Sequence, residues 1–314
     1  MENPTINADG ADNDFVGAPR LRPGEGFAVR GGISRWALRV ATERRGAPLG
    51  LALRNGPRLD PAWYELGGGR LHARASPGPA HASRTPVVLV HGVVVSSRYL
   101  LPAAVELAAD FPVLVPDLPG YGLSDPSPSA PDLATLADAT IECAVGAGHE
   151  RVSLVGNSFG AQIVVEAALR HPERVERVAL LGPTVDSGAR NLLRQYVRWQ
   201  RNAPDEHPSC VLIMARDLSD IGLFRAARLL RVMLGDAIEE KLPHVRCPAL
   251  VVRGGRDRVV PARWAEHVAA LLPRGRLETV AGFSHMAHYS GPLAVLPVLR
   301  PFLLGRPEPA AAED

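Results

Sequence analysis

Ser158 stands between Gly156 and Gly160 in the stretch GNSFG, between an apolar segment and the segment 159–171, which has helical spacing. The G-x-S-x-G pattern between a strand and a helix is typical of a nucleophile elbow, a sharp turn that exposes a serine hydroxyl. Its glycines relieve the crowding of such a turn, and the N–H groups that open the following helix can stabilise negative charge on a reacting oxygen. Serine is also a common N-cap residue of helices, so its role depends on what the rest of the chain supplies.

A serine hydroxyl is a weak nucleophile and needs a base that a third group orients. Asp257 lies just past an expected strand, in the loop GGRDRVVP, and His285 lies just past the next one, in GFSHM. Like Ser158, both stand at the carboxyl ends of strands, where ligands bind in open parallel sheets. The chain order serine, aspartate, histidine is the order that accompanies this elbow. We therefore expect Ser158, Asp257 and His285 to form a catalytic triad.

Other residues could take two of these roles. His288 lies three residues after the preferred histidine and is the alternative base. Asp186, past an earlier expected strand, is the alternative acid. Asp257 could also be a solvated loop charge that pairs with Arg256 or Arg258.

An acyl-transfer site also needs two N–H donors for the oxyanion. One should be that of Phe159, directly after the nucleophile, and the other should come from the loop after the first apolar strand. His91 and Gly92 open that loop, so the N–H of Val93 is the expected donor and that of Val94 the alternative. His91 has no partner with the spacing of metal ligands, and we expect neither a metal nor a cofactor.

Short apolar segments alternate with segments of helical spacing along most of the chain, after a hairpin expected over 63–75. Strands that are apolar on both faces and alternate with helices predict an α/β fold, with a mostly parallel central sheet flanked by helices. The expected strands are 86–92, 112–117, 151–158, 177–183, 248–255 and 276–282, and the expected helices are 96–110, 133–148, 159–171, 262–272 and 292–304.

Residues 184–246 interrupt this alternation, because they contain helical segments and no convincing strand. A helical insertion after the fourth strand of the repeat predicts a lid over the edge of the sheet where ligands bind. One or two short helices are expected within 33–54, and the extension that holds them could brace the lid, pair subunits or touch a membrane surface. The predicted organisation is a disordered segment 1–27, a helical extension 28–57, a core of 58–183 and 247–304, the lid 184–246 and a flexible tail 305–314.

Composition limits the classes of partner. The 35 basic and 33 acidic residues give a net charge of +2, which is too balanced for nucleic acid or an anionic membrane as the main partner. Three cysteines, Cys143, Cys210 and Cys247, favour free thiols over disulfides or a zinc site. The polar start of the sequence has no secretory pattern and no stretch is apolar enough to span a membrane. We therefore expect a cytoplasmic enzyme with a small-molecule substrate, and the oligomeric state stays open.

Five motifs in this order resemble the α/β-hydrolase superfamily over about residues 60–304. The resemblance implies a Ser158–His285–Asp257 triad and an acyl-enzyme intermediate. It disfavours the haloalkane dehalogenase and epoxide hydrolase branches, which use an aspartate at the position of the serine. The motifs are HG at 91–92, DLPGYGLSD at 117–125, GNSFG at 156–160, GGRDRVVP at 254–261 and GFSHM at 282–286.

Asn157, beside the serine, makes the elbow similar to that of the meta-cleavage product hydrolases, which cleave carbon–carbon bonds of dienoate acids. In that branch a tryptophan commonly follows the catalytic histidine, where this chain has Met286. The branch also uses a lid arginine for the substrate carboxylate, and the sequence does not identify one here. The prediction is therefore a serine hydrolase of carboxylic esters or lactones of small to medium hydrophobic substrates. The alternatives are a carbon–carbon hydrolase, or a ligand-binding protein, lyase or acyl transferase on the same scaffold.

Overall fold

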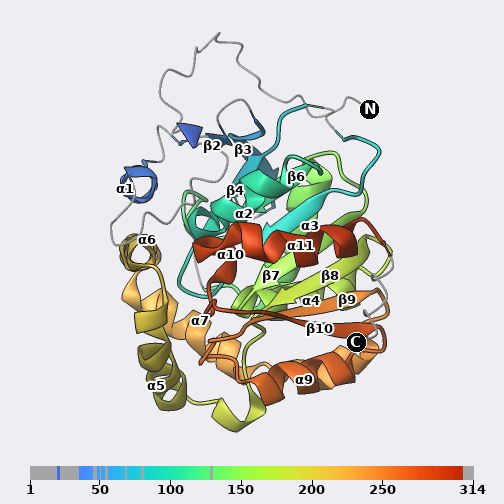
Figure 1. The fold of residues 1–314 in the computed structure, drawn as a ribbon. Coiled ribbons are helices and arrows are strands. Elements are labelled where there is room, and N and C mark those ends of the chain that lie inside the picture. Colours follow the sequence, from blue (N-terminus) through green and yellow to red (C-terminus); the bar gives the residue numbers. More distant parts are fainter. Residues whose placement is uncertain are drawn as a thin grey trace.

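The structure of the chain is a computed structural model (Figure 1). Most of the predicted disordered segment 1–27 and of the predicted flexible tail 305–314 lies outside the part of the chain that the structure describes. The described residues are 20–21, 35–44, 48–49, 51–53, 56–67, 69–78, 81–127 and 130–306.

A mixed sheet forms the centre of the molecule, with the strand order β1-β2-β3-β4-β6-β5-β7-β8-β9-β10 in the described residues. All neighbours from β6 to β10 run parallel, whereas β2, β3, β4 and β6 pair in antiparallel fashion. This arrangement confirms the predicted α/β fold class. The strands are Arg20–Leu21 (β1), Leu51–Leu53 (β2), Arg58–Leu66 (β3), Gly69–Ala75 (β4), Val87–Val90 (β5), Val113–Pro116 (β6), Val152–Asn157 (β7), Val175–Leu181 (β8), Ala249–Gly254 (β9) and Gly275–Val280 (β10).

Helices cover both faces of this sheet because its central strands are apolar on both sides. In β5, Val88 and Val90 enter one hydrophobic cluster, while Val87 and Leu89 enter another. The first cluster includes residues of α3, α4 and α9, and the second includes residues of α2 and α11. The helices of the core are Leu101–Leu107 (α2), Leu133–Gly146 (α3), Phe159–Arg170 (α4), Ala262–Leu271 (α9), Ala287–Ser290 (α10) and Pro292–Leu303 (α11).

The segment 184–246 contains helices and no strand among its residues, all of which are described. Figure 1 shows α5, α6 and α7 grouped at one side of the sheet. The helices are Leu192–Asn202 (α5), Pro208–Ile221 (α6), Leu223–Gly235 (α7) and Ile238–Lys241 (α8), with short 3-10 turns at Ser187–Ala189, Ala203–Asp205 and Leu242–His244.

The N-terminal segment agrees with its prediction of one or two short helices only in part. Residues Arg35–Ala41 form the helix α1, but Leu51–Leu53 form the strand β2 and not a second helix. Leu51 pairs with Leu59 at the edge of β3, so the sheet supplies the backbone partners that a helix would have provided. The predicted hairpin is confirmed, since β3 and β4 pair antiparallel across a short turn.

A buried ion network joins this N-terminal segment to the core and to α6. Glu43 binds the guanidinium groups of Arg74 and Arg98, and all three side chains are fully buried. Arg98, in the 3-10 turn Ser97–Leu100, also pairs with Asp217 of α6. Arg216 of α6 donates to the carbonyl of Glu43 at 3.3 Å. Of the three roles considered for the extension, these contacts favour a brace for the helices of the insertion.

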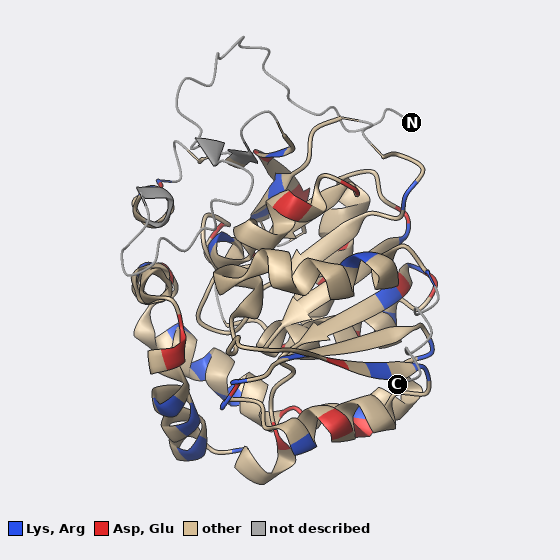
Figure 2. Ribbon diagram, viewed as in Figure 1, with Lys and Arg blue, Asp and Glu red and all other residues tan. Residues whose placement is uncertain are grey.

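Acidic and basic residues are both distributed over the molecule, and several basic residues lie along α5 (Figure 2). Within the described residues, every helix is too short or too polar to cross a lipid bilayer.

Candidate active site

Ser158 occupies the sharp turn between β7 and α4. Its φ of 58° and ψ of −117° lie in a region that residues other than glycine rarely adopt. The neighbouring strand β8 stabilises this turn, because the N–H of Ser158 donates to the carbonyl of Leu181 at 2.9 Å. A Cβ on Gly160 would collide with the carbonyl of Val90 at the end of β5. The second glycine of the motif therefore lets α4 begin directly against the sheet.

His285 and Asp257 form a buried hydrogen-bonded pair. Nδ1 of His285, which follows β10, lies 2.8 Å from Oδ2 of Asp257, which follows β9. The other oxygen, Oδ1, accepts the N–H groups of Val259 and Val260, both at 2.8 Å. An ionised carboxylate only accepts hydrogen bonds, so Nδ1 carries the hydrogen and Nε2 is left as an acceptor.

Charge controls the proton affinity of this imidazole. Burial lowers the pKa of His285, but the carboxylate of Asp257, through its charge and hydrogen bond, and the charge of Glu206 outweigh burial. The pKa of His285 therefore lies above its ordinary value. This is the direction expected for a base whose charged form is stabilised by a paired aspartate.

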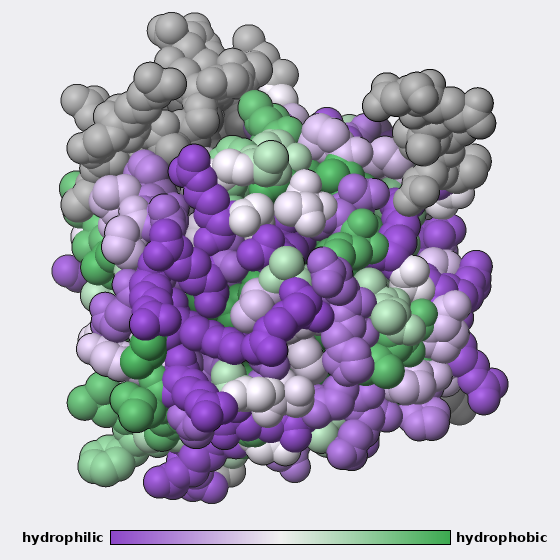
Figure 3. Space-filling view, turned by 60° about the horizontal axis from the view of Figure 1, so that its bottom comes forward, coloured by the Kyte–Doolittle hydropathy of each residue, from purple (hydrophilic) through white to green (hydrophobic). Residues whose placement is uncertain are grey.

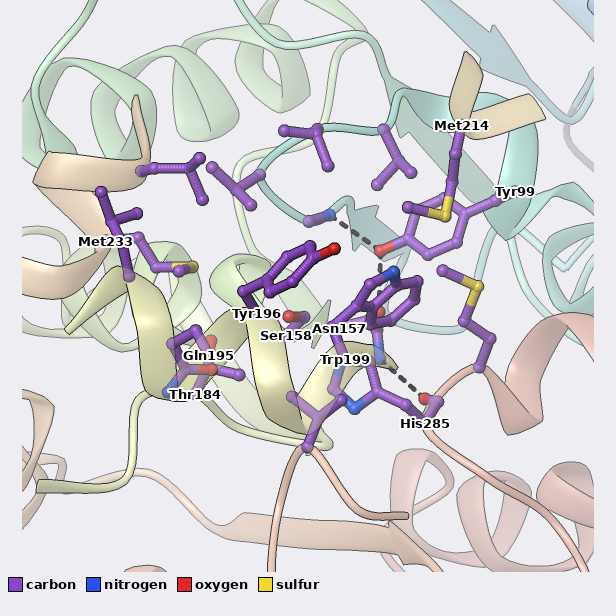
Figure 4. Close-up of a pocket in the computed structure, with 18 residues that line it drawn as sticks. Tyr99, Asn157, Ser158, Thr184, Gln195, Tyr196, Trp199, Met214, Met233 and His285 are labelled. Carbon is purple, nitrogen blue, oxygen red and sulfur yellow. Dashed lines mark hydrogen bonds between the residues drawn. The ribbon is translucent and has the colours of Figure 1, made fainter. Parts of the chain in front are cut away.

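Tyr99 connects the loop after β5 to the elbow. Its hydroxyl accepts from the N–H of Gly92 at 2.8 Å and donates to Oδ1 of Asn157 at 2.8 Å, as the dashed lines in Figure 4 show. The Nδ2 group of Asn157 donates to the carbonyl of Leu181 at 3.0 Å. Because the N–H of Gly92 is already bonded to Tyr99, the next N–H along the loop, that of Val93, is the first candidate to face a ligand.

The two expected oxyanion donors belong to neighbouring segments. Phe159 is the first residue of α4, and the opening N–H groups of a helix have no partner within it. A Cβ on Gly92 would lie 3.5 Å from the Cβ of Ser158, so the loop that carries Val93 runs beside the serine. Val93 and Ser158 also line the same cavity.

The comparison with known proteins identifies the family. A sequence model of the alpha/beta hydrolase family matches residues 87–298, more than half of the chain. This chain belongs to the α/β-hydrolase family. Its family and its relatives make it an enzyme that catalyses hydrolysis.

Two curated relatives and one solved structure illustrate the similarity. The α/β hydrolase is 28% identical to a pyrrolizixenacetamide deacetylase of Xenorhabdus hominickii, over 71% of this chain and 92% of the relative. It is 24% identical to the esterase YbfF of Escherichia coli (strain K12), over 74% of this chain and 99% of the relative. A thermophilic esterase from Thermogutta terrifontis shares the fold, with a TM-score of 0.64 and 22% identity over 78% of this chain and 98% of the other.

A cavity of about 440 Å³ lies beside the expected nucleophile and base (Figure 4). Ser158 and His285 both line it, together with Asn157 and Val93. Asp257 is absent from its lining and lies behind the imidazole, 2% exposed. The rest of the lining is largely apolar: Val94, Val95, Leu192, Tyr196, Trp199, Met214, Leu230, Met233, Val259 and Met286, with Gly92, Tyr99, Thr184 and Gln195.

Among the described residues, those that line the cavity include no lysine, arginine or acidic residue. Three arginines at the start of the insertion bind other groups. Arg190 pairs with Glu239, Arg194 donates to the carbonyl of Gly188, and Arg198 pairs with Asp186. The cavity therefore suits a neutral ligand with an apolar body.

The rim of the cavity is also apolar. Leu192 and Tyr196 of α5 line it and are 52% and 59% exposed. Figure 3 shows hydrophobic surface gathered at its lower left, the side on which α5, α6 and α7 lie in Figure 1. The exposed apolar residues of these helices are Leu192, Leu193, Tyr196, Val197, Val211, Leu223 and Phe224.

The alternative residues have other partners in the structure. Burial and the charge of His285 lower the pKa of His288 to about 3, and its ring stands edge-on to that of Tyr99 at 4.8 Å. Asp186 accepts from Arg198 at 2.6 Å and from Arg263 at 3.2 Å. Neither lines the cavity, and neither is bonded to the elbow.

Both ring nitrogens of His91 are hydrogen-bonded to backbone groups. Its Nε2 accepts the N–H of Leu118 at 3.1 Å, so Nδ1 carries the hydrogen that reaches the carbonyl of Gly92 at 2.9 Å. The ring of His91 therefore connects the loop after β5 to the segment after β6.

Proposed function

We propose that this enzyme hydrolyses carboxylic esters or lactones of small to medium hydrophobic substrates through an acyl-enzyme on Ser158. The observation that carries the proposal is the hydrogen bond between His285 and Asp257 at the edge of a cavity that Ser158 also lines. A strained serine, a histidine oriented by a carboxylate and an apolar cavity are the parts that acyl transfer requires.

The reaction would begin with transfer of the Ser158 proton to Nε2 of His285 as the serine oxygen attacks the substrate carbonyl. Asp257 would hold the ring and stabilise the imidazolium. The N–H groups of Phe159 and Val93 would bind the oxyanion, and each such donor is worth about 10²–10³ in rate. His285 would then protonate the departing alcohol, and a water activated by the same residue would release the acid.

The helices of the insertion would act as a lid that forms the substrate-binding wall. Trp199, Leu230 and Met233 come from α5 and α7 and line the cavity together with the serine. The names of the two curated relatives, a deacetylase and an esterase, support cleavage of an acyl group. No step in this mechanism requires a metal or a cofactor.

The carbon–carbon hydrolase alternative receives less support. A dienoate substrate would bring a carboxylate, and the described lining of the cavity has no cation to bind it. Asn157, the residue that suggested this branch, directs its side chain to Tyr99 and Leu181. Ester hydrolysis needs neither a cation nor a further polar group from Asn157.

The first test is the initial rate of p-nitrophenyl butyrate hydrolysis by the parent and by Ser158→Ala. We expect turnover by the parent and a fall of at least about 10⁴-fold in the variant. A fluorophosphonate probe should add one adduct to the intact mass of the parent and none to that of the variant. A parent no faster than Ser158→Ala, with no adduct, would refute the proposal.

Substrate charge gives a second test of the same site. A p-nitrophenyl ester with a terminal carboxylate, matched in length to an uncharged one, should show a much lower kcat/KM. Burial of an unpaired charge in an apolar cavity is unfavourable. Equal values for the two esters would contradict the neutral-substrate assignment.

A further inference from the structure

The end of α5 is hydrogen-bonded to both loops that carry the proposed acid and base. Oδ1 of Asn202, a fully buried residue, accepts the N–H of Arg258 at 3.0 Å and the hydroxyl of Ser284 at 2.6 Å. Arg258 directly follows Asp257, and Ser284 directly precedes His285. One amide oxygen therefore joins the loop after β9 to the loop after β10.

Glu206, between α5 and α6, completes this connection. Its Oε1 accepts the N–H of Met286 at 3.0 Å and the Nδ2 group of Asn202 at 2.7 Å. Met286 directly follows His285, so the insertion bonds to the residues on both sides of the histidine. The other oxygen of Glu206, Oε2, is buried and has no hydrogen-bond partner among the described residues.

The charge of Glu206 acts on His285 as well as on its backbone. It raises the pKa of His285, as Asp257 does, while burial lowers it. Burial also raises the pKa of Glu206 itself. The other titratable groups in these surroundings are Asp257 and Cys210 near the glutamate, and His288 near the histidine.

We infer that Glu206 and Asn202 are positioning residues of the catalytic site, which act through His285 and its loop. Asn202 fixes the spacing of the loops that hold Asp257 and His285. Glu206 anchors Met286 and supplies a second negative charge for the imidazolium that forms when Ser158 loses its proton. A buried carboxylate with an unpaired oxygen is unfavourable by itself, and a cationic imidazole nearby offsets that cost in the transition state. The inference rests on the proposed function, because it takes His285 as the base.

Glu206→Gln separates the charge from the hydrogen bonds. The amide oxygen can still accept from Met286 and Asn202, but the negative charge is lost. We expect the acid limb of the kcat/KM profile to move to lower pH, because His285 becomes harder to protonate. We also expect the plateau of kcat to fall about tenfold, because the imidazolium loses stabilisation.

Asp205→Asn is the matched control. It removes a carboxylate one residue away, which pairs with the side chain of Arg258 at 3.3 Å at the surface. Its profile should coincide with that of the parent. A Glu206→Gln profile that coincides with the parent as well would overturn the inference.

A readout without substrate keeps this test separate from the proposed function. The pKa of His285 can be followed by NMR of ¹³C-labelled histidine, with the resonance assigned by its loss in His285→Asn. The pKa should fall in Glu206→Gln and stay unchanged in Asp205→Asn, even if the parent hydrolyses no ester. An unchanged pKa in the folded glutamine variant would refute the role of the charge.

Asn202→Ala tests the spacing of the loops. We expect a fall in kcat of about 10- to 100-fold with KM within about twofold, because misplaced catalytic groups reduce the rate more than binding. Asn191→Ala is the control at the other end of α5, where the side chain caps the helix at the N–H of Arg194. Equal effects of both variants on kcat would contradict a specific role for Asn202.

Discussion

Tyr99 lies with its hydroxyl oxygen 2.8 Å from Oδ1 of Asn157, the residue that precedes the proposed nucleophile. The same oxygen accepts from the N–H of Gly92. One buried phenol therefore connects the end of β7, which sets the elbow, to the loop after β5, which carries the expected oxyanion donor. The two segments are far apart in the sequence, and these hydrogen bonds help to fix their relative position.

Tyr99→Phe should therefore reduce both stability and activity. The variant leaves the N–H of Gly92 and Oδ1 of Asn157 without this partner, which costs about 1–3 kcal/mol of unfolding free energy. The freed loop should also lower kcat by up to about 100-fold. Urea denaturation and ester kinetics measure the two effects. Tyr121→Phe is the control, because its equally buried hydroxyl has no hydrogen-bond partner among the described residues; a similar loss there would contradict the explanation.

The strained backbone at Ser158 predicts a difference in stability between two variants that both lack activity. Ser158→Ala keeps the Cβ that makes this backbone conformation unfavourable, whereas Ser158→Gly adopts the same conformation without that Cβ. Both variants should be inactive, but the glycine variant should be more stable than the alanine variant by about 1 kcal/mol. Thermal and urea unfolding of the two inactive proteins measure the difference. Equal stabilities would mean that the turn stores no strain.

Gly182 lies beside the proposed acid and base, where there is no space for a side chain. A Cβ at this position would lie 2.9 Å from Nδ1 of His285 and 3.2 Å from Oδ2 of Asp257. Gly182→Ala should therefore disturb that hydrogen bond and lower kcat by about 100-fold. Gly222→Ala is the control, since it also has a positive φ but meets nothing within 4 Å. Both variants should lose about 1–3 kcal/mol of stability, and only the first should lose activity at temperatures where both are folded.

The raised pKa of His285 fixes the direction of the pH dependence. The base must be neutral to accept the serine proton, so kcat/KM should fall as pH decreases through a pKa above the ordinary histidine value of about 6.5. At pH 6.5 the enzyme should therefore show less than half of its maximal kcat/KM. Asp257→Asn should lower this pKa and reduce kcat by about 10⁴-fold. A pH–rate profile of each protein measures both effects, and an acid limb below pH 6.5 in the parent would contradict the assignment.

The raised pKa of His285 affects stability in the opposite direction to activity, because low pH favours the folded state. Because the pKa of His285 is higher in the folded than in the unfolded chain, protonation of His285 stabilises the fold. This contribution is complete below the unfolded pKa and is lost as pH rises through the folded pKa. The difference in unfolding free energy between the parent and His285→Gln, measured by urea denaturation, should therefore decrease as pH rises through this range, and a difference that does not change with pH would contradict the shift.

Local patterns were enough to predict the parts of the site that lie at strand ends. Ser158, Asp257 and His285 each follow a short apolar segment, so their common edge could be inferred from the alternation of strands and helices. The sequence analysis missed Tyr99, Asn202 and Glu206, because each enters the site through tertiary contacts. A Tyr in SSRYLL or a Glu in APDEHP has no periodicity that indicates a distant partner. The strand Leu51–Leu53 was missed for the same reason, since its partner lies in β3.

The buried ion network has a consequence for where this protein can be cut. The family match begins at residue 87, yet Glu43 binds both Arg74 and Arg98 within the core. A fragment that starts at residue 58 would keep the hairpin and the whole hydrolase core. It would lack Glu43, so the buried guanidinium groups of Arg74 and Arg98 would lose a counter-charge. Breaking one buried ion pair in this way costs about 3–5 kcal/mol of stability. Since Asp217 of α6 binds the same Arg98, that loss would also loosen the insertion, whose helices line part of the cavity. We therefore expect the smallest part of this enzyme that folds on its own to begin earlier in the chain than the region that matches the family model.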